Sequence, residues 1–171
     1  SKSIKKISPI KLKIKSPKET GKTFSSNAQL KAKYFSKFTK LPVISDDSGI
    51  CIKALKNQPG IYSARWAKKH GSFSNAMKFI LKKIKKKKNR SAVFVCSLSF
   101  KYPRKKIITV VGKIKGKISY EMRGINGFGY DPIFIPNSQI LTFGEMTKSS
   151  KINMDHRYIA FKKLKKKIRT L

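Results

Sequence analysis

The chain has 171 residues, 39% of them hydrophobic, and this length and composition suit one globular domain with a buried core. No run of about 18 apolar residues is present, and the opening SKSIKKISPI holds no apolar signal stretch, so the sequence argues against a membrane-spanning or secreted protein. We therefore expect one domain over residues 1–171 and a location in the cytoplasm.

The 42 basic and 7 acidic residues give a formal net charge of +35, which predicts attraction to polyanions. Only six of the basic residues are Arg, the side chain favoured for bidentate contacts with phosphates and bases. The Lys residues are spread along the whole chain beside abundant Ile, Phe and Asn, a bias that an A+T-rich coding sequence also produces. Non-specific polyanion binding at low salt is expected, and a dedicated nucleic-acid surface remains the alternative.

The N-terminal part is expected to form an extended segment followed by a helix. Two prolines keep residues 1–23 out of a helix, and the alternating fragment ISPIKLKIKSP suits an edge strand or an extended segment. Thr23 or Ser25 can cap a helix that ends before Leu41-Pro42. The apolar residues that form one face of this helix are Ala28, Leu30, Ala32, Tyr34, Phe35 and Phe38.

The following residues are expected to form two short strands and a second helix. PVIS (42–45) reads as a short buried strand that delivers Asp46 and Asp47 to its end, and ICIKAL (50–55) alternates as another strand. The stretch over 72–88 predicts a capped amphipathic helix with a basic tail.

Residues 91–102 and 106–119 are long β-branched and aromatic runs, which predict a hairpin of central strands. Gly112 and Gly116 suggest bends or bulges in the second strand. After a loop over 124–136, the stretch over 148–171 is expected to close the chain as a helix.

Asp46 and Asp47 stand side by side in SDDSG, although the chain holds few acidic residues. A turn explains one Asp before Ser-Gly, but adjacent carboxylates repel each other unless a cation or a shared proton lies between them. The pair therefore predicts a cation site, with a plain turn as the alternative.

Three further stretches accompany this pair: ETGKTFSSNAQLKAK at 19–33, GFGYDPIF at 127–134 and KINMDHR at 151–157. In this order, with PGIYSARWA after SDDSG, they resemble the inosine triphosphate pyrophosphatase family, which hydrolyses non-standard purine nucleoside triphosphates (ITP, dITP and XTP) to the monophosphate and pyrophosphate. The resemblance implies an α/β fold with an elongated mixed central sheet flanked by helices, two lobes with an active-site cleft, and a homodimer.

The resemblance also implies a Mg²⁺ site made by Glu19, Asp46 and Asp47, and carboxylates suit this hard cation. Asp47 is implied to take a proton from the attacking water. Lys31 is implied to contact the phosphates, and the Ser48 hydroxyl at a strand end can hold phosphate oxygens. Taken alone, Lys31 would be a surface lysine and Ser48 a turn residue.

The nucleobase is expected to bind between the aromatic loop and the C-terminal His-Arg pair. Phe128 can stack on a purine ring, and Asp131 can accept a hydrogen bond from a base N–H. His156 and Arg157 are donors, which favour the keto oxygen of hypoxanthine or xanthine over the amino group of adenine by about 1 to 3 kcal/mol. A capping or surface role is the alternative for this pair. The other residues expected in the pocket are Gly129, Tyr130 and Lys151.

The resemblance begins where the second strand of the family would begin. The family's first strand and its Thr/Ser-Gly-Asn-x-x-Lys phosphate loop have no counterpart in these residues, so weak or no activity is expected for the 171 residues alone. A catalytically impaired relative, or a basic nucleic-acid-binding protein, is the competing hypothesis.

Overall fold

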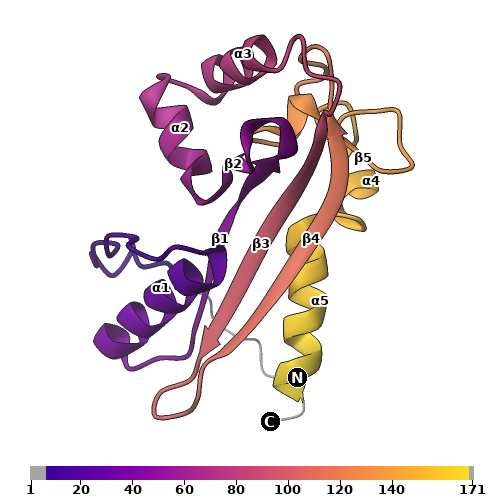
Figure 1. Cartoon of the computed structure of the whole chain (residues 1–171). Coiled ribbons are helices and arrows are strands. Elements are labelled where there is room, and N and C mark those ends of the chain that lie inside the picture. The colour runs from indigo at the N-terminus through magenta and orange to yellow at the C-terminus, as the bar shows by residue number, and fades with distance from the viewer. Residues whose placement is uncertain (1–6, 170–171) are drawn as a thin grey trace.

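The computed structural model describes residues 7–169, in which a central sheet is flanked by helices (Figure 1), as predicted for the α/β class. The strands are β1 (Val43–Ile52), β2 (Gln58–Pro59), β3 (Ser91–Lys101), β4 (Ile108–Ile118) and β5 (Phe134–Pro136). The helices are α1 (Phe24–Thr39), α2 (Ser63–Lys69), α3 (Phe73–Lys83), α4 (Lys148–Ile152) and α5 (His156–Arg169). Within the described range, no helix is long and apolar enough to cross a membrane.

The sheet has the strand order β2-β1-β3-β4-β5, and every pairing between these strands is antiparallel. The expectation of a mixed sheet is therefore wrong for the residues described. The short connection between β3 and β4 permits only a hairpin, which confirms the predicted pair of central strands.

β1 is one ten-residue strand where two short ones were predicted, because it pairs with β3 without interruption from Val43 to Ile52. Asp46 and Asp47 consequently lie in the middle of a strand and not at its end. Since successive side chains of a strand point to opposite faces, the two carboxylates are directed to opposite sides of the sheet. Along its other edge, β1 pairs with β2 only at Cys51 and Ile52.

Helices α1 and α5 pack on opposite faces of the sheet (Figure 1). Thr23 caps α1 as predicted, because its hydroxyl accepts the Ser26 amide and the Ser26 hydroxyl accepts the Thr23 amide. Gly112 and Gly116 form no bulge, since the β3–β4 register is continuous across both. Gly112 instead admits α5, because a Cβ there would lie 2.1 Å from the His156 carbonyl oxygen.

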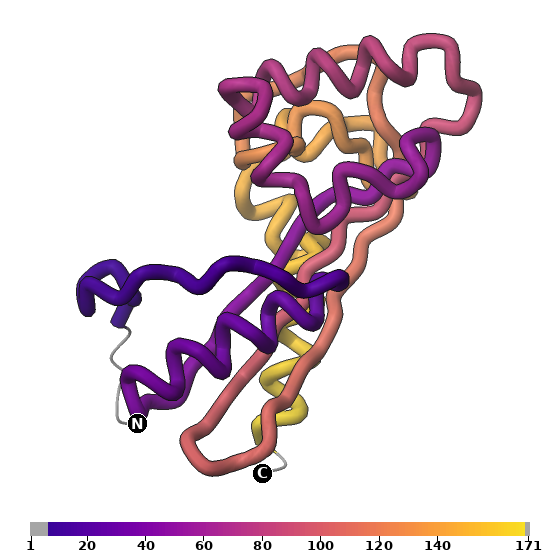
Figure 2. Tube along the Cα trace, turned by 60° about the vertical axis from the view of Figure 1, so that its left-hand side comes forward, coloured from indigo at the N-terminus to yellow at the C-terminus, as the bar shows by residue number. Residues whose placement is uncertain are grey.

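Residues 7–22 form no strand and, after one turn, run extended beside α1 (Figure 2), which is the second of the two expected forms; residues 1–6 lie outside the described range. Other expectations fail at the ends of elements. The basic run after Lys83 leaves the helix, so α3 is shorter than predicted. The predicted C-terminal helix is two helices, α4 and α5, with residues 153–155 between them.

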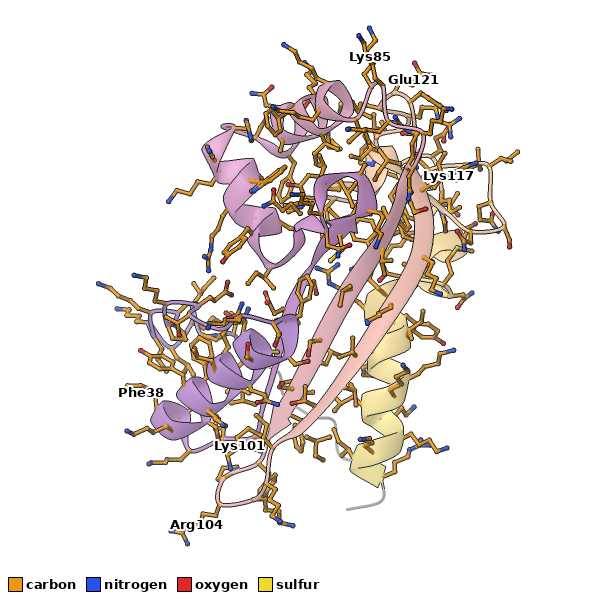
Figure 3. The ribbon with its side chains drawn as sticks, viewed as in Figure 1. Phe38, Lys85, Lys101, Arg104, Lys117 and Glu121 are labelled. Atoms are coloured by element: carbon orange, nitrogen blue, oxygen red, sulfur yellow. The ribbon has the colours of Figure 1, made fainter. Side chains whose placement is uncertain are left out.

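A hydrophobic core fills the space between the sheet, α3 and the residues around β5. Ile50 and Ile52 of β1 meet Ile80 of α3 and Phe134 of β5 there, and all four are fully buried. Most lysines and Phe38 of α1 project outward from this frame (Figure 3). The core thus holds β1 rigidly, with its two faces carrying different polar groups.

Candidate active site

Asp47 lies at the centre of a first cluster, on the face of the sheet that α1 covers. Its carboxylate accepts a hydrogen bond from Asn27 Nδ2 at 3.1 Å and lies 3.7 Å from Lys31 Nζ. Asn27 and Lys31 are four residues apart on α1, so both project from the same side of the helix toward β1. Asp47 is only 7% exposed.

Burial raises the pKa of the Asp47 carboxyl to about 6, because desolvation disfavours the charged form. The hydrogen bond from Asn27 and the charge of Lys31 lower this pKa, while Glu19 and Asp46 raise it. A carboxylate with a pKa of about 6 is ionised at neutral pH and is still basic enough to take up a proton. These are the properties of a general base.

Glu19 joins this cluster through a shared cation. Lys31 Nζ lies 2.7 Å from Glu19 Oε1 and 3.7 Å from Asp47 Oδ1, so one ammonium group bridges the two carboxylates. Arg65 of α2 donates to the Glu19 carbonyl oxygen at 2.9 Å and approaches the Glu19 carboxylate to 3.7 Å. In this structure the Lys31 ammonium therefore lies between Glu19 and Asp47.

Glu19 and Asp47 make a donor set that fits Mg²⁺, which is typically held by one or two carboxylates together with phosphate oxygens and waters. Asp46 does not share this set, because its carboxylate lies on the opposite face of β1, 3.1 Å from Ser48 Oγ and 3.9 Å from Arg157 Nε. Among residues 7–169, no three His, Cys, Asp or Glu side chains gather closely enough to hold a metal. Two of the three expected ligands are thus brought together.

A second cluster surrounds a cavity of about 140 Å³ on the other face of β1. Phe94 of β3 and Phe73 of α3 contribute apolar walls. Seven of the residues expected to bind substrate line this cavity: Ser48, Phe128, Gly129, Tyr130, Asp131, His156 and Arg157. The aromatic loop and the His156-Arg157 pair therefore meet as predicted. Ser48, which was expected to hold phosphate oxygens near Lys31, lies with these residues instead, on the other face of β1.

Asp131 fixes the aromatic loop from within. Its Oδ2 accepts the Phe128 amide at 2.7 Å and lies 2.5 Å from Lys151 Nζ, and both charged side chains are almost fully buried. Gly127 has a φ of +77°, and a Cβ at this position would lie 2.1 Å from Asp131 Oδ2. The loop therefore closes on the Asp131 carboxylate only with glycine at this position.

Tyr130 attaches the same loop to α2. Its hydroxyl donates to the Ser63 carbonyl oxygen at 2.9 Å, and its ring packs edge-on against Phe73. Burial raises the pKa of Tyr130, which is 2% exposed. Its side chain thus supports the floor of the cavity.

His156 and Arg157 begin α5, and α5 directs them at the aromatic loop. The Arg157 guanidinium lies 4.6 Å from the centre of the Phe128 ring, a cation–π contact. The His156 ring stacks on Phe94 with centroids 4.8 Å apart and planes 7° apart. Phe128 itself is 58% exposed, so a ligand can cover much of its ring. Phe128 and Arg157 also line a larger hollow of about 600 Å³ beside α4.

Asp155, which the sequence reasoning missed, holds this pair in place. Its Oδ1 accepts the Arg157 amide at 2.6 Å and lies 3.1 Å from His156 Nδ1, and its Oδ2 lies 3.7 Å from Lys151 Nζ. Burial acts to raise the pKa of Asp155, but the contacts with His156, the Arg157 amide and Lys151 outweigh it and lower the pKa to about 2. An acidic residue directly before His-Arg, in a chain so poor in acids, was the available signal.

Asn27 was also missed. It is fully buried, and its Oδ1 accepts the Gly21 amide at 2.8 Å while its Nδ2 donates to Asp47. It thereby ties the segment that carries Glu19 to the strand that carries Asp47. Its position one helical turn before Lys31 could have identified it.

Comparisons with known sequences agree with one another. The sequence profile of the Ham1 family matches residues 1–167. The chain is 42% identical over 156 residues to the dITP/XTP pyrophosphatase of Caulobacter vibrioides, covering 90% of this chain and 80% of that protein. It is also 42% identical over 166 residues to the dITP/XTP pyrophosphatase of Dictyoglomus thermophilum, covering 95% and 80%.

Solved structures give the same result. The Ham1 protein of Staphylococcus aureus superposes with a TM-score of 0.88 at 34% identity, over 95% of this chain and 84% of that one. A HAM1 protein from Coxiella burnetii superposes with a TM-score of 0.88 at 33% identity and the same coverage.

Proposed function

The chain belongs to the Ham1 family, and from this premise we propose that it hydrolyses the non-standard purine nucleoside triphosphates ITP, dITP and XTP to the monophosphate and pyrophosphate. The observation that carries the proposal is a buried Asp47 with a pKa of about 6, next to cationic Lys31, in a chain 42% identical to dITP/XTP pyrophosphatases. A nucleotide-hydrolysing site needs such a base beside groups that attract phosphate.

In the proposed reaction, water attacks the α-phosphorus and its proton passes to the Asp47 carboxylate. A bond forms between the water oxygen and the α-phosphorus, and the bond from that phosphorus to the bridging oxygen of pyrophosphate breaks. Lys31 and Arg65 lie close enough to this carboxylate or to Glu19 to attract the phosphates. Glu19 and Asp47 would hold a Mg²⁺ ion, which when bound neutralises phosphate charge and lowers the pKa of water.

The cavity on the other face of β1 is proposed to select the base. A purine ring that stacks on Phe128 would meet Arg157 and His156, whose N–H groups pair with a keto oxygen at the 6-position and oppose an amino group there. A donor left facing a donor costs about 1 to 3 kcal/mol, so adenine nucleotides would bind more weakly by roughly 5- to 150-fold. Lys151 and Asp155 act indirectly, by holding the loop and the His-Arg pair.

A nucleotide that used both clusters would pass over the edge of β1. Asp47 and Ser48 point to opposite faces, and β1 lacks a paired strand on its outer side from Val43 to Ile50 within the described chain. The base would then lie on the α5 side and the phosphates on the α1 side. This path places the scissile bond beside Asp47 and keeps the base apart from the metal ligands.

The test is pyrophosphate release from XTP, dITP, ITP, GTP and ATP, with Mg²⁺ and with EDTA. We expect Mg²⁺-dependent turnover of the first three, weak for these 171 residues alone, at least tenfold slower turnover of ATP, and none in EDTA. Hydrolysis that releases inorganic phosphate, or equal rates with ATP, would overturn the proposal. A homodimer is proposed from the family resemblance, and light scattering coupled to size exclusion tests it. The cytoplasmic location expected from the sequence stays a proposal.

A further inference from the structure

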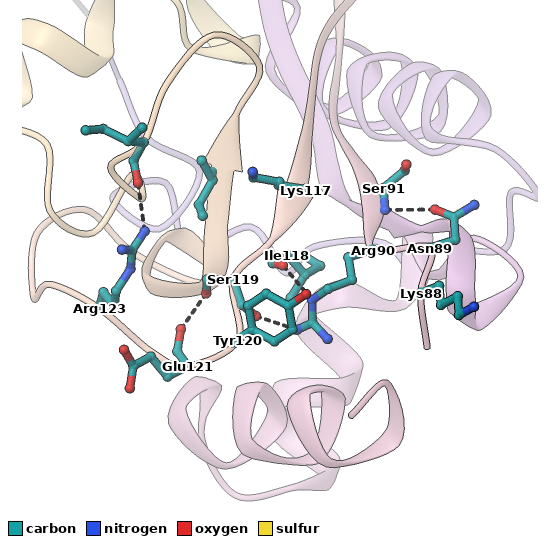
Figure 4. A pocket seen from close by; sticks show the side chains of 12 residues that line it. Lys88, Asn89, Arg90, Ser91, Lys117, Ile118, Ser119, Tyr120, Glu121 and Arg123 are labelled. Carbon is teal, nitrogen blue, oxygen red and sulfur yellow. Dashed lines mark hydrogen bonds between the residues drawn. The ribbon is translucent and has the colours of Figure 1, made fainter. Parts of the chain in front are cut away.

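A third hollow of about 490 Å³ lies apart from both clusters (Figure 4). It forms where the loop after α3 enters β3 and where β4 runs out into the following loop. Four of its lining residues, Lys88, Arg90, Lys117 and Tyr120, carry the inference. None of these residues lines either of the cavities beside Phe128.

Arg90 forms the floor of this hollow and is held rigidly. Its guanidinium donates three hydrogen bonds to backbone carbonyls, from Nε to Ile118 at 2.8 Å, from Nη1 to Ile84 at 3.1 Å and from Nη2 to Ser119 at 2.5 Å. The side chain is buried although it carries a charge. Because each guanidinium nitrogen already donates to a backbone carbonyl, Arg90 is not available to bind an anion. It is a rigid support for the side chain that packs on it.

The Tyr120 ring packs on the Arg90 guanidinium, with the ring centre 4.4 Å from the guanidinium carbon (Figure 4). It is nevertheless 85% exposed. A cation on one face of an aromatic ring holds its orientation by a cation–π contact. The result is an aromatic surface that is oriented by the protein and open to solvent.

Lys88 and Lys117 stand around the same hollow, and within residues 7–169 neither forms an ion pair or a hydrogen bond through its side chain. Lys88 ends the run KKIKKKK at 82–88, so positive charge continues outward from the hollow along the surface. Glu121 is the acidic residue in the lining. The surroundings of Tyr120 therefore favour a ligand that carries several negative charges.

We propose that this hollow binds single-stranded nucleic acid, with an unpaired base stacked on Tyr120 and the adjoining phosphates at Lys88 and Lys117. An aromatic platform beside a basic groove is the arrangement by which proteins bind single strands without sequence preference. A duplex hides the faces of its bases within the helical stack, so it gains only the electrostatic part of the binding. The surface is distinct from the proposed hydrolytic site.

Fluorescence anisotropy of the full chain with a labelled single strand of about 12 nucleotides tests the proposal, at a salt concentration that suppresses general attraction to the basic surface. We expect Tyr120→Ala to weaken binding roughly 5- to 150-fold, as loss of one stacked base predicts, and Tyr120→Phe to preserve it. Tyr102→Ala is the matched control, because Tyr102 is 47% exposed and also faces a lysine, Lys105, but lies at the hairpin tip.

Two further variants separate stacking from charge. Lys88→Ala and Lys117→Ala should each lower the slope of log affinity against log salt by about 0.7, the value expected for one phosphate contact on a single strand. The proposal is overturned if Tyr120→Ala binds like the parent, if Tyr102→Ala loses as much, or if Tyr120→Ala weakens duplex binding equally. Asp47→Asn should bind the single strand normally, so a failed hydrolysis assay leaves this test intact.

Discussion

Asp47 and Asp155 are both largely buried carboxylates, yet their pKa values move in opposite directions. The side chains are 9% and 14% exposed, and burial acts to raise the pKa in both. Asp47 has one hydrogen bond and one ammonium as compensation, opposed by the charges of Glu19 and Asp46, and its pKa rises to about 6. Asp155 has a histidine ring, a backbone amide and a lysine, and its pKa falls to about 2.

Burial acts to raise both pKa values, so the difference between the two carboxylates lies in the partners that compensate for it. Asp155 stays an anion throughout the physiological range and can therefore only orient its neighbours. Asp47 exchanges a proton near neutral pH, which is what proton transfer from water demands. Each of the following predictions tests one side of this difference.

Asp47→Asn should produce the largest effect. Removing the base should lower pyrophosphate release by roughly 10²- to 10⁴-fold. The metal-free variant should also be more stable than the parent at pH 7, because a group whose pKa is raised in the folded state makes unfolding easier once it ionises.

The pH dependence of this gain has a defined sign. Between the unfolded pKa of 3.8 and the folded value of about 6, the native parent holds more protons than the unfolded chain, so its stability falls as pH rises. The difference in melting temperature between variant and parent should grow from about pH 4 to pH 6 and then level off. A destabilised Asp47→Asn would contradict this prediction.

Lys151→Met should be the most destabilising change on the Asp155 side. Lys151 Nζ contacts both Asp131 and Asp155, so its loss leaves buried negative charge without a cation. Breaking a buried pair in this way costs about 3 to 5 kcal/mol in unfolding free energy, measurable by urea titration. Adding Asp131→Asn should recover part of the loss, because it removes the uncompensated charge. A double variant no more stable than the single one would show that the pair is not coupled.

The sequence predicted those elements whose signals are local. The cap at Thr23 and three residues of the expected apolar face of α1, Ala28, Ala32 and Phe35, are signalled within a few turns of one helix, whereas Phe38, expected on the same face, is exposed. The β3–β4 hairpin follows from two long β-branched runs. β1 could not be predicted in full, because Asp, Ser and Gly are depleted in strands and only the ladder with β3 holds Asp46–Gly49 extended.

The sequence predicted which residues form the candidate site better than it predicted how these residues are arranged. The meeting of the aromatic loop with His156 and Arg157 was expected from the order of the motifs, and the cavity confirms that these residues are neighbours. The separation of Asp46 from Asp47 was not expected, because it depends on both residues lying inside one strand. Asn27 and Asp155 were overlooked since their roles arise from partners distant in the sequence.

Phe128→Ala should affect binding and leave stability nearly unchanged. Loss of a stacked base costs about 1 to 3 kcal/mol, so kcat/KM for XTP should fall roughly 5- to 150-fold, mainly through KM. Phe38→Ala near the end of α1 (Figure 3) is a matched control, because Phe38 is 59% exposed and Phe128 is 58% exposed. Equal effects of the two changes on KM would show that the aromatic loop is not part of the substrate site.

Asn27→Ala should produce the smallest and most specific effect, a shift in the pH dependence of hydrolysis. The hydrogen bond from Asn27 Nδ2 lowers the pKa of Asp47, so its removal should raise that pKa and move the acidic limb of the kcat/KM profile to higher pH. Gln29→Ala is the control on the same helix, because Gln29 Nε2 donates to Thr109 and not to Asp47. A profile that stays in place for Asn27→Ala, or moves equally for Gln29→Ala, would mean that Asp47 is not the group whose protonation limits the reaction. A shift seen in Asn27→Ala and not in Gln29→Ala would instead assign the acidic limb of the profile to the buried Asp47 carboxylate.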